Sequence, residues 1–311
     1  MQPNSKILIT GASGMVGSAL VRAFTPLAYH LFTPTHAELD LRNQNRVLSY
    51  FEKNKFDYVF HLAAIVGGIH ANHHFPAKFI YDNTLMQSNV IHSAFECGVK
   101  KLMLPGSACT YPKLAEQPIK ETAFLDGKIE PTNIAYAAAK INGIVMAQSF
   151  AREHQFNVIT PMPTNAYGVG DNFDPQASHV IPALMKRFHD AKTAKLAQVT
   201  LWGSGTPLRE FIYVDDLADA LIFLMQEYDS YELINVGTMQ EIAIFELAKA
   251  IATIVGFEGE IELDPSKPDG APRKCLDSSP LFTLGWQPRT DLLEGLTQMY
   301  RYHFGVQRLT A

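Results

Sequence analysis

The chain has 311 residues, 47% hydrophobic and 18% charged, with a formal net charge of −5. This length fits one large or two medium domains, and the composition is that of a soluble globular protein. Because basic residues form no block, nucleic acid is excluded as an expected partner.

The first half of the chain alternates short apolar segments with helical ones. We expect strands at 6–11, 29–34, 57–64, 99–107 and 156–168, and helices at 14–24, 46–55, 83–97 and 135–154. Nearly continuous apolar strands that alternate with helices predict a parallel sheet covered on both faces. The predicted fold class is therefore α/β, with a Rossmann-type doubly wound parallel sheet and a smaller α/β domain.

The pattern loosens after residue 168. We expect helices at 179–191, 215–226 and 241–256, a strand and a turn within 199–214, a strand at 232–237, and a strand followed by a loop within 260–277. No long linker separates the two halves, so we expect them to pack directly on each other.

Three further features concern the compartment. No apolar run approaches the roughly 20 residues of a membrane helix, and the polar segment MQPNSKILITG does not resemble a signal peptide. The three cysteines are odd in number and far apart in the sequence. We therefore expect a reducing, cytoplasmic environment with no membrane partner.

A glycine-rich turn, GASGMVG at 11–17, follows the first strand and opens a helix. Gly11 permits the tight turn, Gly14 lets the backbone approach a pyrophosphate, and Gly17 allows close packing of helix and sheet. The helix N-terminus favours an anion. At this position the motif predicts dinucleotide binding.

The second predicted strand ends at Thr33, Pro34, Thr35 and His36. A carboxylate there would bind a free ribose 2′-hydroxyl and repel a 2′-phosphate. Its absence favours NADP, with His36 and Arg42 as the nearest cations. Asp40 follows, and it is suited equally to meeting the adenine or to capping the next helix.

Tyr136 and Lys140 form a YxxxK pair in a helical stretch, so both side chains share one face. We expect the ammonium to lower the pKa of the phenol, which suits proton exchange with a carbonyl oxygen during hydride transfer. Ser107 follows a strand and can orient that oxygen. The pair alone occurs often by chance, and the upstream glycine loop makes chance a poor explanation.

Five segments, GASGMVG, HLAA, GSACTYP, YAAAK and PTNAYG, resemble the extended short-chain dehydrogenase/reductase family. The segments VGGIHAN, SHVIPALMKRFHDA, WGSGTPLREFIYVDD and KPDGAPRK are similar to its GDP-sugar epimerase/reductases, and the likeness spans nearly the whole chain. The resemblance implies that C3 and C5 of GDP-4-keto-6-deoxymannose are epimerised and that C4 is then reduced with NADPH. It also implies a homodimer formed through helices 83–98 and 135–154.

The resemblance assigns roles to five catalytic residues. Cys109 matches the base of epimerisation and His179 matches the acid. Tyr136 matches the proton donor of reduction, and Lys140 matches the residue that tunes the pKa of that donor. Ser107 matches the group that orients the keto oxygen. A thiolate and an imidazole are chemically plausible here. Taken alone, Cys109 is equally a small core residue, and His179 an ordinary helix-start histidine.

The resemblance also supplies the ligand contacts. The cofactor residues are Gly11, Ser13, Gly14, Met15, Val16, Gly17, His36, Asp40, Leu41, Ala63, Lys140, Pro163, Asn165 and His179. The substrate residues are Val180, Leu184, Arg187, Trp202, Arg209 and Asp269. The NADP-binding domain is expected at 1–166 with 211–240, and the GDP-sugar domain at 167–210 with 241–311.

Two alternative functions remain, and a possible metal site also has to be considered. The same chemistry could act on another GDP-4-keto sugar, a dideoxyhexose or a heptose, or the chain could be an inactive NADP-binding regulator. Against the inactive protein, all five catalytic residue types are present. His70, His73 and His74 invite a metal site, but no carboxylate stands at ligand spacing, so we expect none.

Overall fold

The computed structural model describes residues 1–175, 178–267 and 269–305, without the side chains of residues 69, 70 and 73. The strands are β1 (Lys6–Thr10), β2 (His30–Phe32), β3 (Tyr58–His61), β4 (Lys101–Met103), β5 (Val158–Pro163), β6 (Asn165–Tyr167), β7 (Gln198–Trp202), β8 (Leu208–Tyr213), β9 (Leu233–Val236), β10 (Glu241–Ala243), β11 (Glu260–Asp264) and β12 (Arg273–Lys274). The α-helices are α1 (Met15–Phe24), α2 (Gln44–Asn54), α3 (Ile69–His74), α4 (Pro76–Glu96), α5 (Ile134–His154), α6 (Val180–Thr193), α7 (Val214–Glu227), α8 (Ile244–Val255), α9 (Ser279–Thr283) and α10 (Leu292–Phe304).

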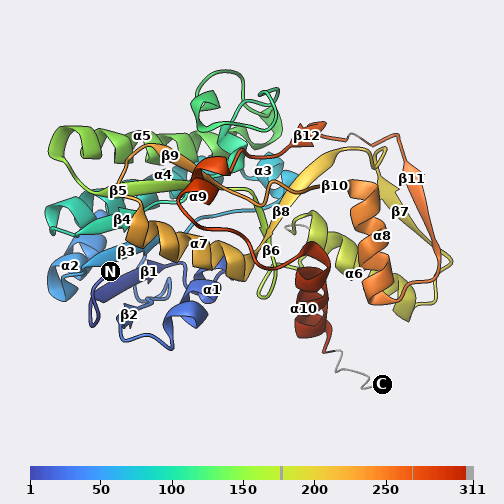
Figure 1. Cartoon of the computed structure of the whole chain (residues 1–311), viewed down its shortest axis with the longest axis horizontal. Helices are drawn as coiled ribbons and strands as arrows, with labels where there is room; N and C mark the ends of the chain where they lie inside the picture. Colours follow the sequence, from blue (N-terminus) through green and yellow to red (C-terminus); the bar gives the residue numbers. More distant parts are fainter. Residues whose placement is uncertain (176–177, 268, 306–311) are drawn as a thin grey trace.

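A six-stranded parallel sheet organises the first half of the molecule, in the order β2-β1-β3-β4-β5-β9. Its strands send alternate side chains to two separate cores. Ile7 and Ile9 pack with α1 and α7, whereas Leu8 packs with α2, α4 and α5. The predicted doubly wound α/β sheet is confirmed (Figure 1).

A second, smaller lobe is built around helices α6, α8 and α10 (Figure 1). The strands β7 and β11 form a two-stranded parallel sheet, and β8 pairs with β6, β10 and β12. Leu184, Phe188, Leu247 and Leu296 are among the buried side chains of this second core. Strand β8 lies between the lobes because its partner β6 directly follows β5 of the main sheet.

Three expected elements differ from the structure. Helix α4 begins at Pro76, seven residues before its predicted start, since proline is well suited to the first helical turn. The predicted strand 156–168 divides after Pro163, where the chain leaves the main sheet to pair with β8. The predicted helix 241–256 begins only at Ile244, because Glu241–Ala243 pair antiparallel with β8.

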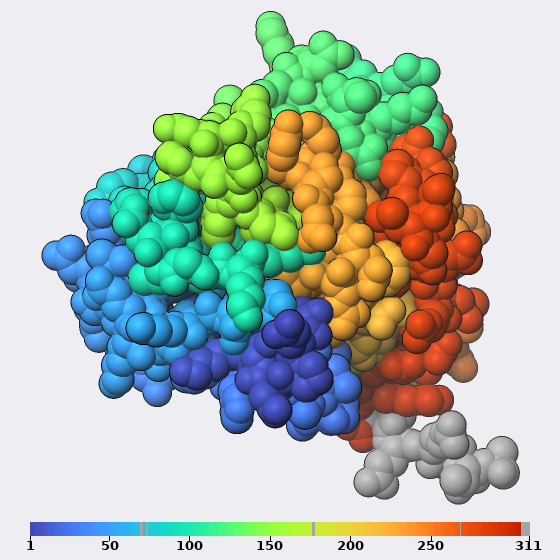
Figure 2. All heavy atoms as spheres, turned by 60° about the vertical axis from the view of Figure 1, so that its left-hand side comes forward, coloured from blue at the N-terminus to red at the C-terminus, as the bar shows by residue number. Residues whose placement is uncertain are grey.

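Residues 273–277, called here the strap, return from the second lobe to the first. Its beginning pairs with β8, and its end exchanges backbone hydrogen bonds with Ile119. Beyond it, Leu281 and Trp286 are buried in the core between the main sheet and α7. Figure 2 shows this red segment beside the green excursion after β4. The predicted assignment of residues 241–311 to the second domain stays a prediction. Within that range, the strap and α9 pack mainly on the first lobe.

Within the described part of the chain, no helix combines the length and the apolar character that crossing a bilayer requires.

Candidate active site

Four of the predicted site residues follow strands of the main sheet at its carboxyl edge. Gly11 follows β1, Ala63 follows β3, Ser107 follows β4 and Asn165 follows β5. The chain order reverses between β1 and β3, and open α/β sheets bind ligands at such a switch point, outside the carboxyl ends of the strands. The topology therefore brings residues from four separate segments to one edge.

The glycine turn is shaped for close contacts. Gly11 has φ +72°, and a Cβ there would lie 2.7 Å from the backbone nitrogen of Ala63. A Cβ on Gly17 would lie only 2.1 Å from the Gly11 carbonyl oxygen. The first turn of α1, which includes Met15 and Val16, carries no acidic residue. Its N–H groups and the helix dipole suit a pyrophosphate.

The loop after β2 contains a carboxylate, Glu38, that the sequence analysis did not assign. The Glu38 side chain accepts hydrogen bonds from the backbone N–H and the hydroxyl of Thr35, at 2.8 and 2.9 Å. His36 is exposed beside it. Asp40 binds Arg42 through two hydrogen bonds of 2.9 and 2.8 Å, and this guanidinium strongly lowers the pKa of the carboxyl. Asp40 therefore closes a local turn instead of capping α2, whose N-cap is Asn43.

Ser107 and Cys109 are held by a single turn of 3₁₀ helix, Ala108–Thr110. The Ser107 hydroxyl accepts a hydrogen bond of 3.3 Å from the Cys109 backbone N–H. Cys109 is buried and Ser107 is half-buried. Tyr111, at the end of the turn, is buried and donates a hydrogen bond to Asn235 on β9, at 2.7 Å. Tyr111 thus anchors the turn that carries Ser107 and Cys109 to strand β9.

Tyr136 and Lys140 lie one turn apart near the start of α5, as their spacing predicted. The Lys140 ammonium donates a 2.8 Å hydrogen bond to the Pro105 carbonyl oxygen. Burial lowers the pKa of Lys140 to about 8. Burial also raises the pKa of the Tyr136 phenol, and the Ser107 hydroxyl only partly opposes this. The expected lowering of the phenol pKa is wrong for this structure, because burial and the neighbouring Cys109 thiolate both raise the pKa.

Two cationic side chains act electrostatically on the Cys109 thiol, and one of them was missed in the sequence. Burial raises the pKa of the thiol, whereas Lys274 and then Lys140 oppose that rise by favouring the thiolate. Burial lowers the pKa of Lys274, and the Cys109 thiolate opposes this change in turn. Lys274 belongs to the segment KPDGAPRK, and no spacing in the sequence connects it with position 109.

His179 lies at the N-cap of α6, and its ring makes no hydrogen bond within the described part of the chain. The ring reaches solvent although protein surrounds it on most sides, and this desolvation lowers its pKa. A lowered pKa makes the protonated imidazole a stronger proton donor. No contact between His179 and Cys109 is present, so their pairing in one reaction stays a prediction.

The second lobe presents an aromatic face between cations. Trp202 is 62% exposed, and the Arg187 guanidinium and the Lys267 ammonium lie 5.9 and 5.7 Å from its ring centroid. Arg187 also donates a hydrogen bond to the Thr200 carbonyl oxygen. An exposed indole flanked by positive charge suits stacking on a nucleobase that carries phosphates.

Arg209 and Lys274 are direct partners in the register of β8 and β12, so their side chains leave the sheet on one face. Two neighbouring cations suit a diphosphate. Asp269 instead accepts hydrogen bonds from the backbone N–H and hydroxyl of Ser204, at 2.7 and 2.8 Å. It therefore shapes the turn after Trp202, and direct substrate contact stays a prediction.

The remaining predicted contacts occupy different environments. Leu184 is buried in the second core, whereas Val180 is partly exposed at the start of α6. Pro163 is half-buried at the end of β5, and Leu41 packs in the core beside α2. Ser13 and Gly14 are exposed in the glycine turn. The side chains of His70 and His73 lie outside the described residues.

A dinucleotide turn and a Tyr–Lys pair at one sheet edge define the class of pyridine-nucleotide-dependent enzymes that act on carbonyl groups. The chain belongs to the NAD dependent epimerase/dehydratase family, whose family model matches residues 7–237.

Similar proteins agree with this class. GDP-L-fucose synthase 1 of Arabidopsis thaliana is 52% identical over 301 residues, which cover 96% of this chain and 93% of the relative. A GDP-6-OMe-4-keto-L-xylo-heptose reductase from C. jejuni is 35% identical, with a TM-score of 0.92 over 98% of this chain and 99% of that structure. A GDP-L-fucose synthetase from Naegleria fowleri bound to NADP is 28% identical, with a TM-score of 0.90 over 98% and 95%.

Proposed function

We propose that this protein converts GDP-4-keto-6-deoxy-D-mannose into GDP-L-fucose, by epimerising C3 and C5 and then reducing C4. The observation that carries the proposal is that one turn holds both a residue of a ketone-reductase site and a thiol suited to proton abstraction. Ser107 stands with Tyr136 and Lys140 in a reductase arrangement, and Cys109, whose thiol is buried, lies two residues away and donates a hydrogen bond from its backbone N–H to the Ser107 hydroxyl. Simple ketone reduction does not need a thiol.

The epimerisation needs a base, an acid and support for an enolate. Hydrogen bonds from Ser107 and Tyr136 to the C4 keto oxygen would acidify the protons on C3 and C5. The Cys109 thiolate takes a proton from the carbon, and the electron pair moves onto the keto oxygen. His179 then returns a proton to the opposite face of the same carbon, which inverts its configuration. The substrate's atoms and charge are unchanged, and before the next inversion Cys109 releases its proton to solvent and His179 takes one up.

The residues present fit NADP(H): Gly11 and Gly17 let the turn fold tightly where a Cβ would collide with the backbone of Ala63 or Gly11, and no acidic residue stands in the first turn of α1 to repel a phosphate. The first turn of α1 and Asn165 would hold the dinucleotide, and Lys140 would bind its nicotinamide ribose. When bound, NADPH supplies the hydride for C4. Tyr136 delivers the proton to the C4 oxygen, and burial keeps its phenol protonated beforehand.

The substrate's nucleotide end would lie on the second lobe. Trp202 would stack on guanine, and Arg187, Arg209 and Lys274 would neutralise the diphosphate. These assignments are supported by the exposure of the indole and by the register of β8 with β12. The similar heptose reductase supports a second candidate, in which the same site reduces a GDP-4-keto heptose.

A homodimer in the cytoplasm completes the proposal. Ile80 and Tyr81 on α4 and Val145 on α5 are exposed apolar residues, and these two helices pack against each other. Exposed apolar side chains on paired helices suit an isologous interface. All three cysteines are free, which agrees with a reducing compartment.

The deciding experiment is a turnover assay with purified protein. We expect NADPH oxidation with GDP-4-keto-6-deoxymannose, and GDP-L-fucose as the product identified by chromatography. Turnover on a GDP-4-keto heptose alone would replace the first candidate with the second. NADPH binding without turnover on either sugar would support a regulatory protein instead.

A further inference from the structure

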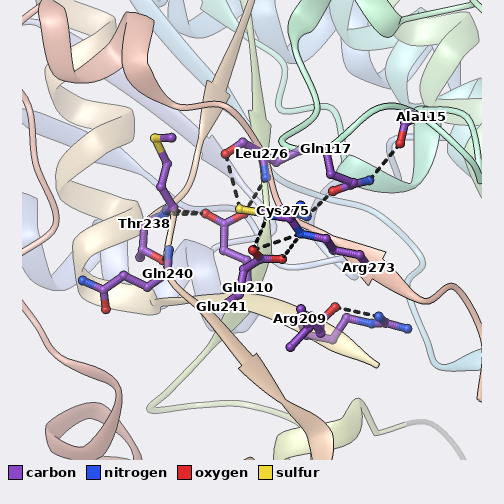
Figure 3. Close-up of polar contacts among 12 residues, drawn as sticks. Ala115, Gln117, Arg209, Glu210, Thr238, Gln240, Glu241, Arg273, Cys275 and Leu276 are labelled. Atoms are coloured by element: carbon purple, nitrogen blue, oxygen red, sulfur yellow. Dashed lines mark hydrogen bonds and ion pairs between the residues drawn. The ribbon is translucent and has the colours of Figure 1, made fainter. Parts of the chain in front are cut away.

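Glu210 is a fully buried carboxylate on β8, next to Arg209 in the sequence and outside the reaction described above. Figure 3 shows it at the centre of a set of polar contacts from several segments. Burying a carboxylate is strongly unfavourable unless hydrogen bonds satisfy its oxygens. Its hydrogen-bond partners therefore indicate what the fold depends on at this position.

The two carboxylate oxygens bind separate parts of the chain. Oε1 accepts hydrogen bonds from the backbone N–H groups of Thr238 and Met239, both at 2.7 Å. Oε2 accepts one from the backbone N–H of Leu276 in the strap, at 2.9 Å. A Cβ at Gly237 would stand 2.2 Å from Oε1, so this glycine leaves the room that the carboxylate needs. Glu210 thus joins the turn before β10 to the strap.

The backbone of the same residue reaches the other side of the site. Its carbonyl oxygen accepts hydrogen bonds from the Asn165 amide at 3.0 Å and from the Thr164 hydroxyl at 3.3 Å. Asn165 is one of the predicted cofactor contacts. The backbone of Glu210 is therefore held by residues that follow the main sheet. Its side chain binds the strap, so the strap is held in a fixed position relative to that sheet.

The strap is also attached to the segment that follows the Cys109 turn. The backbone N–H of Cys275 donates to the Gln117 side chain at 2.9 Å, and the Ile119 N–H donates to the Cys275 carbonyl at 2.8 Å. Lys274 precedes these tethers by one residue. Its placement near Cys109 and beside Arg209 therefore depends on where the strap is held.

We propose that Glu210 is a positioning residue, which holds the strap so that the Lys274 ammonium stands at the Cys109 thiol and at the substrate diphosphate. The catalytic consequence rests on the proposed function, whereas the placement of the strap does not. The three backbone groups that bind the two oxygens are all N–H donors, so both oxygens act as acceptors.

This requirement makes Glu210→Gln a sharp test. The glutamine oxygen can keep the two bonds from Thr238 and Met239, and its NH₂ group then faces the Leu276 N–H. The hydrogen bond to the strap is lost and two donors oppose each other, while the side chain keeps its volume. The matched control is Glu241→Gln, which removes a carboxylate that pairs with Arg273 at the edge of the same strap.

The first readout needs no substrate. Cys275 lies in the strap and is 3% exposed, so its alkylation by iodoacetamide, followed by peptide mass spectrometry, reports opening of the strap. Losing one buried hydrogen bond should raise this rate about tenfold. Cys97 serves as the internal reference, and Glu241→Gln should leave the Cys275 rate within about twofold. An unchanged Cys275 rate in Glu210→Gln would overturn the proposal.

The second readout separates positioning from general damage. With GDP-4-keto-6-deoxymannose, we expect C3 and C5 deuterium exchange to fall about tenfold more than ketone reduction, and the KM to rise. Equal losses in both steps would contradict a role through Lys274. If Glu210→Gln does not fold, Glu210→Asp, which keeps the charge but shortens the reach to Leu276, takes its place. If Cys275 becomes reactive in Glu210→Gln but the unmodified protein shows no turnover, the proposed function is rejected and the role of Glu210 in holding the strap stands.

Discussion

The Lys140 ammonium donates a 2.8 Å hydrogen bond to the Pro105 carbonyl oxygen, inside the protein and next to the turn that carries Ser107 and Cys109. This contact ties α5, which bears Tyr136, to the end of β4. One buried cation therefore fixes the start of α5 against the segment that leads from β4 to Ser107 and Cys109.

Lys140 is expected to set a basic limit on reduction. Burial lowers its pKa to about 8, so the ammonium is lost as the pH rises through that value, and kcat/KM for NADPH-dependent reduction should fall. Lysine in the unfolded chain titrates near 10.5. Between pH 8 and pH 10.5 the unfolded chain therefore binds more protons than the folded one, so this group makes the free energy of unfolding rise with pH in that range.

Lys140→Met should abolish reduction yet raise the thermal midpoint, because a buried charge is removed. A lower midpoint would contradict this.

Cys109→Ser should separate the two reactions. A serine hydroxyl cannot provide the thiolate base, so we expect C3 and C5 deuterium exchange to fall by about 10²–10⁴-fold while Tyr136-dependent ketone reduction remains. In the unmodified protein, exchange should increase with pH as the thiol, whose pKa burial raises, loses its proton. Cys97→Ser is the matched control. Full exchange in Cys109→Ser would remove Cys109 from the mechanism.

Gly17→Ala tests the glycine turn. The new methyl would stand 2.1 Å from the Gly11 carbonyl oxygen, so the turn must move and NADPH affinity should fall at least about tenfold in a calorimetric titration. Gly98→Ala is the control for general destabilisation, because Gly98 has a positive φ of +68° and open space around it. It should lose about 1 kcal/mol of stability and keep its NADPH affinity. Similar affinity losses in both variants would point to general destabilisation.

The loop after β2 predicts relaxed discrimination between the two nicotinamide cofactors. His36 is exposed, the Glu38 carboxylate is held at the neighbouring Thr35, and Arg42 is paired with Asp40, so little positive charge meets a 2′-phosphate. We expect His36→Arg to raise the NADPH-over-NADH preference in kcat/KM about tenfold or more, since charge-assisted hydrogen bonds are strong. A His36→Gln control should not. An unaltered ratio in His36→Arg would place the 2′-phosphate elsewhere.

Trp202→Ala tests recognition of the base. Aromatic stacking on a nucleobase contributes about 1–3 kcal/mol, so the KM for the GDP-sugar should rise about tenfold or more with a nearly unchanged kcat. Trp202→Phe keeps a stacking face and should recover most of the loss. If Trp202→Ala lowers kcat with an unchanged KM, the indole does not bind the nucleotide.

Local patterns were sufficient for much of the fold. The alternation of apolar strands and amphipathic helices gave the parallel sheet, and the spacing of Tyr136 and Lys140 on a helix gave the reductase pair. They failed where pairing partners are distant in the chain. Nothing near Glu241 indicates that it begins an edge strand on β8, and the two-residue strand β12 has no periodicity to detect.

The sequence by itself determined the glycine turn, the catalytic residue types and the family resemblance, because each depends on residues within a few positions of one another. Only the tertiary structure decided which groups surround Cys109. Lys274 approaches it because the strap is held by Glu210 and Gln117 across the two lobes. The structure also decided the state of Tyr136: its neighbours suggested a lowered pKa, and burial, a property of the whole fold, raises it.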